Sequence, residues 1–252
     1  MTEENNAASY TALSLDIGMR MLVCGAQIGR VENSIERMCK AFGAVETHVF
    51  SVTSGIIVTC VNEDGSSITQ LRRVRSEKFD MNKLEQLNQL SRDICAHRAT
   101  ATDIPTRLTA IDHSRSYPFW LLILAYAVIS ASLSVFFGAT ATDALASAIT
   151  GVILCLSERL LLRLRMDRVF TSFLLALLAG LCNAAMVRFG FGMHYEAISL
   201  GNIMLLIPGI AMTNSIHDMF VGDMISGVSR FFQSLVTAFI VTFGFTLAGM
   251  LL

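Results

Sequence analysis

Five long apolar segments dominate the second half of the chain, and they constrain its fold more than any other feature. They lie at residues 118–137, 142–162, 169–187, 197–216 and 230–251. An α-helix rises about 1.5 Å per residue, so each segment approaches the roughly 20 residues needed to cross about 30 Å of hydrocarbon. Buried helices of a soluble core rarely run this long without a charged face. The sequence therefore predicts five transmembrane helices.

The composition also indicates a membrane protein. Mean hydropathy is +0.57, and 15% of the residues are charged, against about 25% in an ordinary soluble domain. A net charge of −1 without a long basic run lacks the electrostatic signature of a protein that binds nucleic acid. The six cysteines form no CxxC or CxxxC pair, so we predict neither a metal site nor a cofactor.

Charged residues are concentrated before Tyr117, which predicts two domains, residues 1–115 and residues 116–252. The polar start MTEENNAASY lacks the basic and apolar regions of a secretory signal peptide. We therefore expect residues 1–115 to form a cytoplasmic domain. The predicted fold class is an α-helical integral membrane bundle of five transmembrane helices with an N-terminal α+β cytoplasmic domain that packs one sheet face against its helices.

Local patterns predict the elements of the N-terminal domain. Apolar residues at helical spacing predict two helices that end at Gly25 and Gly43, since glycine is a common C-terminal cap. The stretches VETHVFSV, GIIVTCV and SITQLRRV are rich in β-branched residues and predict a small antiparallel sheet. Asp80 is placed to cap a third helix. The stretch TATDIPTRLTAIDHSRSYP, which contains Pro105, is predicted to be a linker.

The charges of the loops predict the orientation of the spans. The loop ERLLLRLRMDR holds four arginines, whereas GATA, between the first two spans, holds none; the arginines are Arg159, Arg163, Arg165 and Arg168. Short loops rich in Lys and Arg remain on the cytoplasmic side. We therefore predict a multi-pass protein of the cell inner membrane, with the N-terminus in the cytoplasm and the C-terminus outside.

Small residues recur at intervals of four within three spans. They are Ser147, Gly151 and Cys155, then Ala176, Gly180 and Ala184, then Gly244 and Ala248. Such stripes allow close approach of helices in a bundle. Ordinary helix contacts without a role in transport explain them most simply.

The fourth span contains a proline and a glycine in the stretch IMLLIPGIAMTNSIHDMFVGDMISGVSR. Pro208 has no N–H, so the carbonyl of Met204 loses its helical donor, and Gly209 weakens the helix further. Non-helical backbone at membrane depth is tolerated where it is buried in protein or lines a wet cavity, and transporters use such breaks at substrate sites. A functional break and a simple packing kink both remain open.

Polar residues follow this break. Asn214, Asp218 and Gly222 are four residues apart and share a helical face, with His217 beside it. A carboxylate at the bilayer centre costs about 3 kcal/mol and rarely faces lipid, yet Asp218 could also be a solvated carboxylate at the span's end. His217 could relay protons or be a surface residue. Arg230 could anchor the topology or neutralise an anionic substrate.

These residues resemble a known family. The stretch CGAQIGRVENSIERMCKAFG before paired strands, and the motif P-G-x4-N-x3-D-x3-G-x4-G-x2-R, resemble the threonine/serine exporter (ThrE) family, most of all its short YjjP type. The resemblance covers nearly the whole chain but carries over no established binding residue. Our candidate residues for the transport pathway are Pro208, Gly209, Asn214, His217, Asp218, Gly222 and Arg230.

The resemblance implies a secondary exporter. No serine or cysteine nucleophile motif, HExxH motif or paired metal ligands accompany His217 and Asp218, so we predict that the chain is not an enzyme. Larger members fuse two membrane halves, so the short type implies a separate small membrane protein as the other half, in a homo- or hetero-oligomer within the lipid bilayer. The short type also implies export of a small organic anion, a C4-dicarboxylate such as succinate, whereas the fused type implies threonine and serine. A membrane-anchored metabolite sensor or scaffold is an alternative of another class.

The predicted orientation can be tested with reporter fusions at two positions. A fusion at residue 165 should report the cytoplasm, and a fusion at residue 192 should report the outside, because the arginine-rich loop stays inside. The measurement is the activity of a reporter that is active on one side of the membrane only. A reversed pattern would contradict the orientation.

Overall fold

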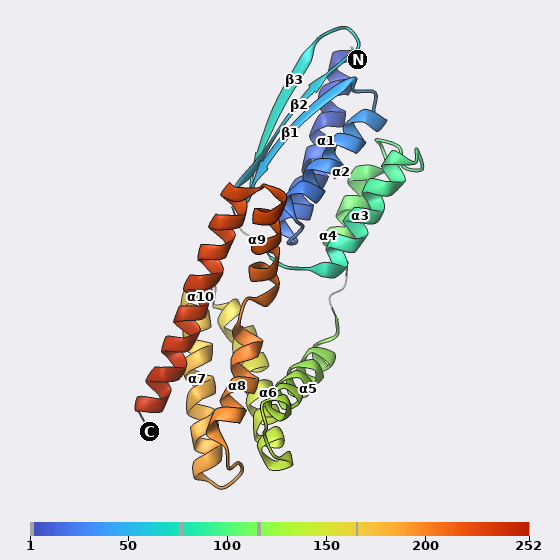
Figure 1. Cartoon of the computed structure of the whole chain (residues 1–252). Helices are drawn as coiled ribbons and strands as arrows, with labels where there is room; N and C mark the ends of the chain where they lie inside the picture. The colour runs from blue at the N-terminus through green and yellow to red at the C-terminus, as the bar shows by residue number, and fades with distance from the viewer. Residues whose placement is uncertain (1–2, 76–77, 115–116, 165, 252) are drawn as a thin grey trace. The chain divides into compact units, whose positions relative to one another are not determined.

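A computed structural model describes the fold of the chain at residues 3–75, 78–114, 117–164 and 166–251 (Figure 1). Arg165, which is one of the loop arginines and the site of one reporter fusion, lies outside the described residues. The structure is mostly helical. It divides into two compact units, one of residues 1–116 with 213–231, and the other of residues 117–212 with 232–252.

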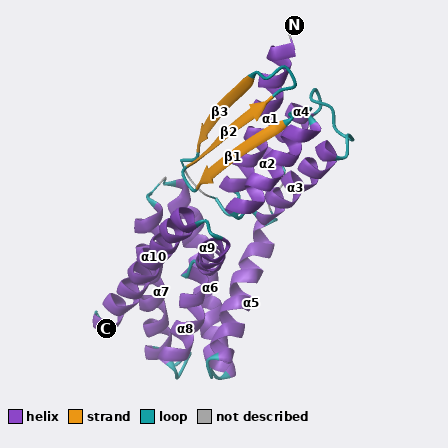
Figure 2. Ribbon diagram, turned by 45° about the horizontal axis from the view of Figure 1, so that its top comes forward, coloured by secondary structure: helices purple, strands orange, loops and turns teal. Residues whose placement is uncertain are grey.

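The N-terminal part of the first unit, before residue 116, contains four described helices and a three-stranded antiparallel sheet of order β1-β2-β3. Its elements are α1 (Glu3–Val23), α2 (Ile28–Ala41), β1 (Glu46–Val52), β2 (Gly55–Val61), β3 (Ser67–Arg73), α3 (Met81–Cys95) and α4 (Ile104–Asp112). The helices α1 and α2 lie against one face of the sheet (Figure 2). Alternate residues of β2, namely Ile56, Val58 and Cys60, are buried in the core with apolar side chains of the helices.

Local signals in the sequence set several of these boundaries. Gly25 and Gly43 have φ of +95° and +99°, so both act as the left-handed helix ends that the sequence predicted. Asp80 caps α3, because its carboxylate accepts the backbone N–H of Lys83 at 3.0 Å, also as predicted.

The predicted linker before the first span is partly wrong, because it contains α4 (Ile104–Asp112). Pro105 lies in the first turn of this helix, where its missing N–H breaks no helical hydrogen bond. The side chains of Ile104, Leu108 and Ile111 share one helical face and are buried in the core of the first unit. The proline therefore begins a helix rather than marking a loop.

The second half of the chain contains the apolar helices. They are α5 (Phe119–Phe136), α6 (Ala141–Arg163), α7 (Arg168–Arg188), α8 (Tyr195–Leu206), α9 (Gly209–Val221) and α10 (Met224–Met250). By length and composition, α5, α6, α7 and α10 could each cross a membrane. The pair of α8 and α9 would supply a fifth span if it counts as one broken helix. The described residues thus hold four such helices, or up to five spans.

The fourth predicted segment is broken at its proline. Between α8 and α9 the helix axis bends by 59°, and Ile207 has the extended φ of −70° and ψ of 131° that a residue before proline prefers. The predicted end of the fourth span, at residue 216, and the predicted start of the fifth, at residue 230, were wrong. α9 continues to Val221 and α10 already begins at Met224, so the stretch 217–229 between the fourth and fifth predicted spans is mostly helical and holds only a two-residue turn.

Within the second unit, the stripes of small residues are helix contacts. A Cβ added to Gly180 of α7 would lie 2.5 Å from the Cβ of Ala248 on α10. A Cβ on Gly244 would lie 2.8 Å from that of Ala176, and one on Gly151 of α6 would lie 2.9 Å from that of Ser130 on α5. The bundle therefore depends on the absence of side chains at these glycines.

The substitution Gly180→Val tests this close approach. Because the added side chain would overlap Ala248, the variant should lose about 1–3 kcal/mol of stability and melt at a lower temperature in detergent. The control is Gly249→Ala on the same helix as Ala248, since its added Cβ would have no atom nearer than 4.0 Å. Equal melting temperatures for the two variants would contradict the contact.

Candidate functional site

Asp218 on α9 and Arg230 on α10 form a buried ion pair. The Nη1 group of Arg230 donates to Oδ2 of Asp218 at 2.8 Å, and the two residues are 1% and 2% exposed. A buried charge that loses its partner is strongly destabilising, so each group depends on the other. The alternative that Asp218 is a solvated carboxylate is therefore wrong.

Two glycines of the motif bring α9 and α10 close enough for this pair. Gly222 lies in the turn between the helices with φ of +109°, a conformation that glycine adopts without strain. A Cβ on Gly227 of α10 would lie 2.8 Å from the backbone N of Met219 and the backbone O of Ser215 on α9. The helices thus meet backbone to backbone at Gly227.

The same carboxylate contacts the beginning of α2. The carboxylate of Asp218 lies beside the backbone N–H of Ile28, the first residue of α2, and Asn214 donates from Nδ2 to the carbonyl O of Gly25 at 3.4 Å. The partial positive charge of a helix N-terminus favours a carboxylate. The two sequence stretches that carry the family resemblance, around Gly25 and around Asp218, therefore contact each other.

Two more carboxylates lie near the first turns of α2. Asp223, in the turn after α9, has Oδ2 3.7 Å from where a Cβ on Gly29 would be. Glu32 accepts the backbone N–H of Ser51 on β1 at 2.7 Å. Burial raises the pKa of Glu32, the Asp223 carboxylate adds to this rise, and the Ser51 hydrogen bond opposes it. The contact between α2 and the α9–α10 hairpin is therefore rich in carboxylates, and it also contains Arg230, which pairs with Asp218.

The structure brings together only part of the predicted site. Asn214, Asp218, Gly222 and Arg230 belong to one cluster in the first unit. His217 is exposed. Pro208 and Gly209 lie at the break between α8 and α9 and belong to the second unit, where a Cβ on Gly209 would meet nothing within 4 Å.

A second polar cluster, which sequence reasoning missed, lies in the core of the second unit. We call it the serine–asparagine network. Ser130 of α5 makes hydrogen bonds with the hydroxyl of Ser147 on α6, at 2.8 Å, and with the side-chain carbonyl of Asn202 on α8. The Nδ2 group of Asn202 donates to Oδ1 of Asn183 on α7 at 3.0 Å, and Nδ2 of Asn183 donates to Ser199 at 3.2 Å. Four helices are joined by buried polar groups.

The sequence contained a signal for this network. Asn183 and Asn202 interrupt the apolar runs LLAGLCNAAMV and ISLGNIMLL, and polar residues within a span are functional candidates by default. Ser147 was interpreted only as a small residue. One turn later Thr150 is also 0% exposed, and its hydroxyl has no hydrogen-bond partner among the described residues.

Asp143 forms a third buried polar site, outside the candidates predicted from the sequence. Its carboxylate accepts the backbone N–H groups of Met193 and His194 at 2.6 and 3.1 Å, and it pairs with the His194 ring at 2.8 Å. It also completes a capping box with Thr140 at the start of α6. These contacts satisfy a fully buried carboxylate and tie α6 to the connection between α7 and α8.

The long apolar helices and the polar groups buried between them define a multi-pass helical membrane protein. A family profile described as "Putative threonine/serine exporter" matches residues 12–252, and the chain belongs to this family. The resemblance inferred from the two motifs is thereby confirmed.

Curated relatives include both types of exporter. "Probable succinate transporter subunit YjjP" of Klebsiella aerogenes is 22% identical over 230 residues, which cover 90% of this chain and 88% of that protein. "Threonine/serine exporter" of Corynebacterium glutamicum is 22% identical over 245 residues, which cover 94% of this chain and 50% of that protein. "Probable threonine/serine exporter" of Mycobacterium tuberculosis is 25% identical over 229 residues, and the match covers 43% of that protein. No solved structure matches the chain significantly.

Removing one partner of the Asp218–Arg230 pair should destabilise the fold. Asp218→Asn and Arg230→Gln should each cost about 3–5 kcal/mol, because each removes one charge of a buried ion pair. The double variant should lose less than the sum of the two, as measured by unfolding in detergent. The control Glu36→Gln removes an exposed pair with Lys40 and should cost under about 1 kcal/mol. Additive losses would contradict the pairing.

Proposed function

We propose that this chain is one half of a secondary exporter that moves small organic anions, C4-dicarboxylates such as succinate, out of the cytoplasm. The observation that carries this proposal is the serine–asparagine network in the helical bundle of an exporter-family chain. Buried polar side chains among spans commonly mark a substrate or ion pathway. The break at Pro208 adds backbone carbonyls without helical donors, which transporters use near their substrate sites.

The share of each relative's length that the match covers supports a dicarboxylate substrate. The relative named as a succinate transporter subunit matches along nearly its full length, whereas the relatives named as threonine/serine exporters match along about half of theirs. Export of threonine and serine is the second candidate. It is favoured by the mixed charges around α2, because a zwitterion needs both a cation and a carboxylate.

We also propose a separate membrane partner. The word "subunit" in the name of the Klebsiella aerogenes relative supports an assembly of more than one chain. Transporter sites commonly lie between two structural repeats, and a second membrane protein would supply the other repeat. The orientation proposed is an inner-membrane protein whose N-terminal α+β domain, residues 1–115, is cytoplasmic.

In the proposed mechanism, Arg230 exchanges partners. A dicarboxylate that leaves water needs a cation, and Arg230 can bind a carboxylate through two parallel hydrogen bonds. In the structure, the guanidinium group of Arg230 is paired with the carboxylate of Asp218. Protonation of Asp218 would release Arg230 for the substrate, so proton binding and anion binding would be coupled. Asn214, which donates to the carbonyl O of Gly25, keeps α9 beside the first turn of α2 during this exchange.

Substitutions of the pair separate the two substrate classes. With the partner co-expressed, Arg230→Gln should abolish efflux of labelled succinate, and Asp218→Asn should retain exchange but lose its pH dependence. If threonine is the substrate, Asp218→Asn should instead abolish threonine efflux, because the ammonium group of threonine would lose the negative charge of Asp218. Efflux is measured from loaded cells and normalised to the amount of protein in the membrane.

The double variant Asp218→Asn/Arg230→Gln is the matched control for folding. It restores charge balance in the buried site but offers no cation, so it should fold better than Arg230→Gln and still not export succinate. Wild-type succinate efflux by the double variant would contradict the role of Arg230. Loss of neither flux in either single variant would mean that the site lies elsewhere.

A further inference from the structure

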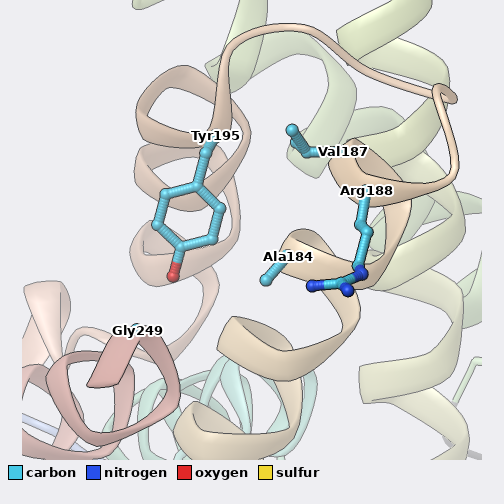
Figure 3. A pocket seen from close by; sticks show the side chains of 5 residues that line it. All are labelled: Ala184, Val187, Arg188, Tyr195 and Gly249. Atoms are coloured by element: carbon cyan, nitrogen blue, oxygen red, sulfur yellow. The ribbon is translucent and has the colours of Figure 1, made fainter. Parts of the chain in front are cut away.

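The second unit contains a cavity that belongs to neither polar cluster. Its volume is about 300 Å³, at the lower end of the roughly 300–1,000 Å³ typical of small-molecule sites. Three helices line it: Ala184, Val187 and Arg188 come from α7, Tyr195 from the first turn of α8, and Gly249 from the end of α10 (Figure 3). None of these residues was selected from the sequence as a site.

Two polar side chains point into this cavity. The guanidinium group of Arg188 and the phenolic hydroxyl of Tyr195 face the space between their helices (Figure 3). Neither side chain makes a hydrogen bond or an ion pair with another residue that the structure describes. Arginine remains charged at all physiological pH values and presents five N–H donors. The cavity therefore offers a cation whose donors are available to a ligand.

The rest of the lining is apolar and small. Ala184 and Val187 supply methyl groups, and Gly249 has no side chain that could fill the space. A Cβ added at Gly249 would lie 4.0 Å from the hydroxyl O of Tyr195, so a side chain larger than that of alanine at this position would extend into the space beside the phenol. Arg188 and Gly249 are both exposed, so a ligand can reach the cavity from the surface of the unit.

From this geometry we propose that the cavity binds a small organic carboxylate. Arg188 pairs with one carboxylate group through two parallel hydrogen bonds, and the hydroxyl of Tyr195 donates a further one. The carbon chain of the ligand lies against Ala184 and Val187. The ligand class rests on the proposed export function, in which this cavity is a second substrate site besides Arg230, at the end of the bundle where α7 connects to α8.

The test is direct binding to the full chain without transport. The purified protein in phosphatidylcholine nanodiscs is dialysed against labelled succinate. Arg188→Gln should weaken succinate binding roughly 10- to 100-fold, as expected for hydrogen bonds to a charged group, and Tyr195→Phe roughly 2- to 10-fold. Gly249→Leu should abolish binding by filling the cavity with both polar groups intact. The matched control is Arg163→Gln, because Arg163 ends α6 as Arg188 ends α7, and this variant should bind like the wild type.

Several outcomes would overturn the proposal. Unchanged binding in Arg188→Gln, or an equal loss in Arg163→Gln, would show that no specific cation site exists. Equal binding of the uncharged diamide of succinic acid would exclude a carboxylate site. Complete competition by phosphatidylglycerol in the nanodisc would assign Arg188 to a lipid headgroup instead.

The binding test is independent of the export test. One combination of results would refute the proposed exporter and leave the binding site standing. In it, the purified protein binds succinate in a manner that depends on Arg188, but cells that contain the protein and its partner export no succinate. Succinate export with unaltered binding in all three cavity variants would refute the site and leave the exporter standing.

Discussion

A charge that is removed from water must be matched by an opposite charge, and the contact of α9 with α10 and α2 depends on how Asp218 and Arg230 meet this requirement. The pair joins α9 to α10, and the same carboxylate lies beside the first N–H of α2. Gly222 and Gly227 serve this contact by reversing the chain and by removing side chains from the crossing. The motif that links these residues in sequence is therefore a single packed unit in space.

The second unit satisfies its buried polar groups in a different way. The serine–asparagine network uses neutral hydroxyl and amide groups, which cost less to bury than charges and can exchange hydrogen bonds with a passing solute. The carboxylate of Asp143, in contrast, makes hydrogen bonds with Thr140, Met193 and His194. These bonds link α6 to the connection between α7 and α8. Polar burial in this bundle thus includes one network that could rearrange and one carboxylate that is fixed.

Arg230 and Arg188 have different surroundings, which suit them to different roles. Arg230 is 2% exposed and paired with Asp218, so it is open to a substrate only if that pair separates. Arg188 is exposed beside a cavity, and no described residue neutralises it. In an exporter, a buried cation that must exchange partners suits coupling, whereas an available cation suits capture or release of an anion.

The sequence by itself determined the features that depend on near neighbours in the chain. Apolar length predicted the spans, the missing N–H of Pro208 predicted the break, and Gly25, Gly43 and Asp80 predicted helix ends. The helix α4 was missed because the same proline signal is compatible with a loop and with a helix start.

Only the tertiary structure decided which distant groups meet. Asp218 and Ile28, Asn183 and Asn202, and Arg188 and Tyr195 come from different elements, and helical periodicity places a residue on a face without saying what that face contacts. The burial of Asp218 depends on the early start of α10 at Met224, which brings Arg230 back alongside α9. The turn at Gly222 and the close crossing at Gly227 allow this early start. The crossing is a contact between two helices, so no local pattern in the sequence records it.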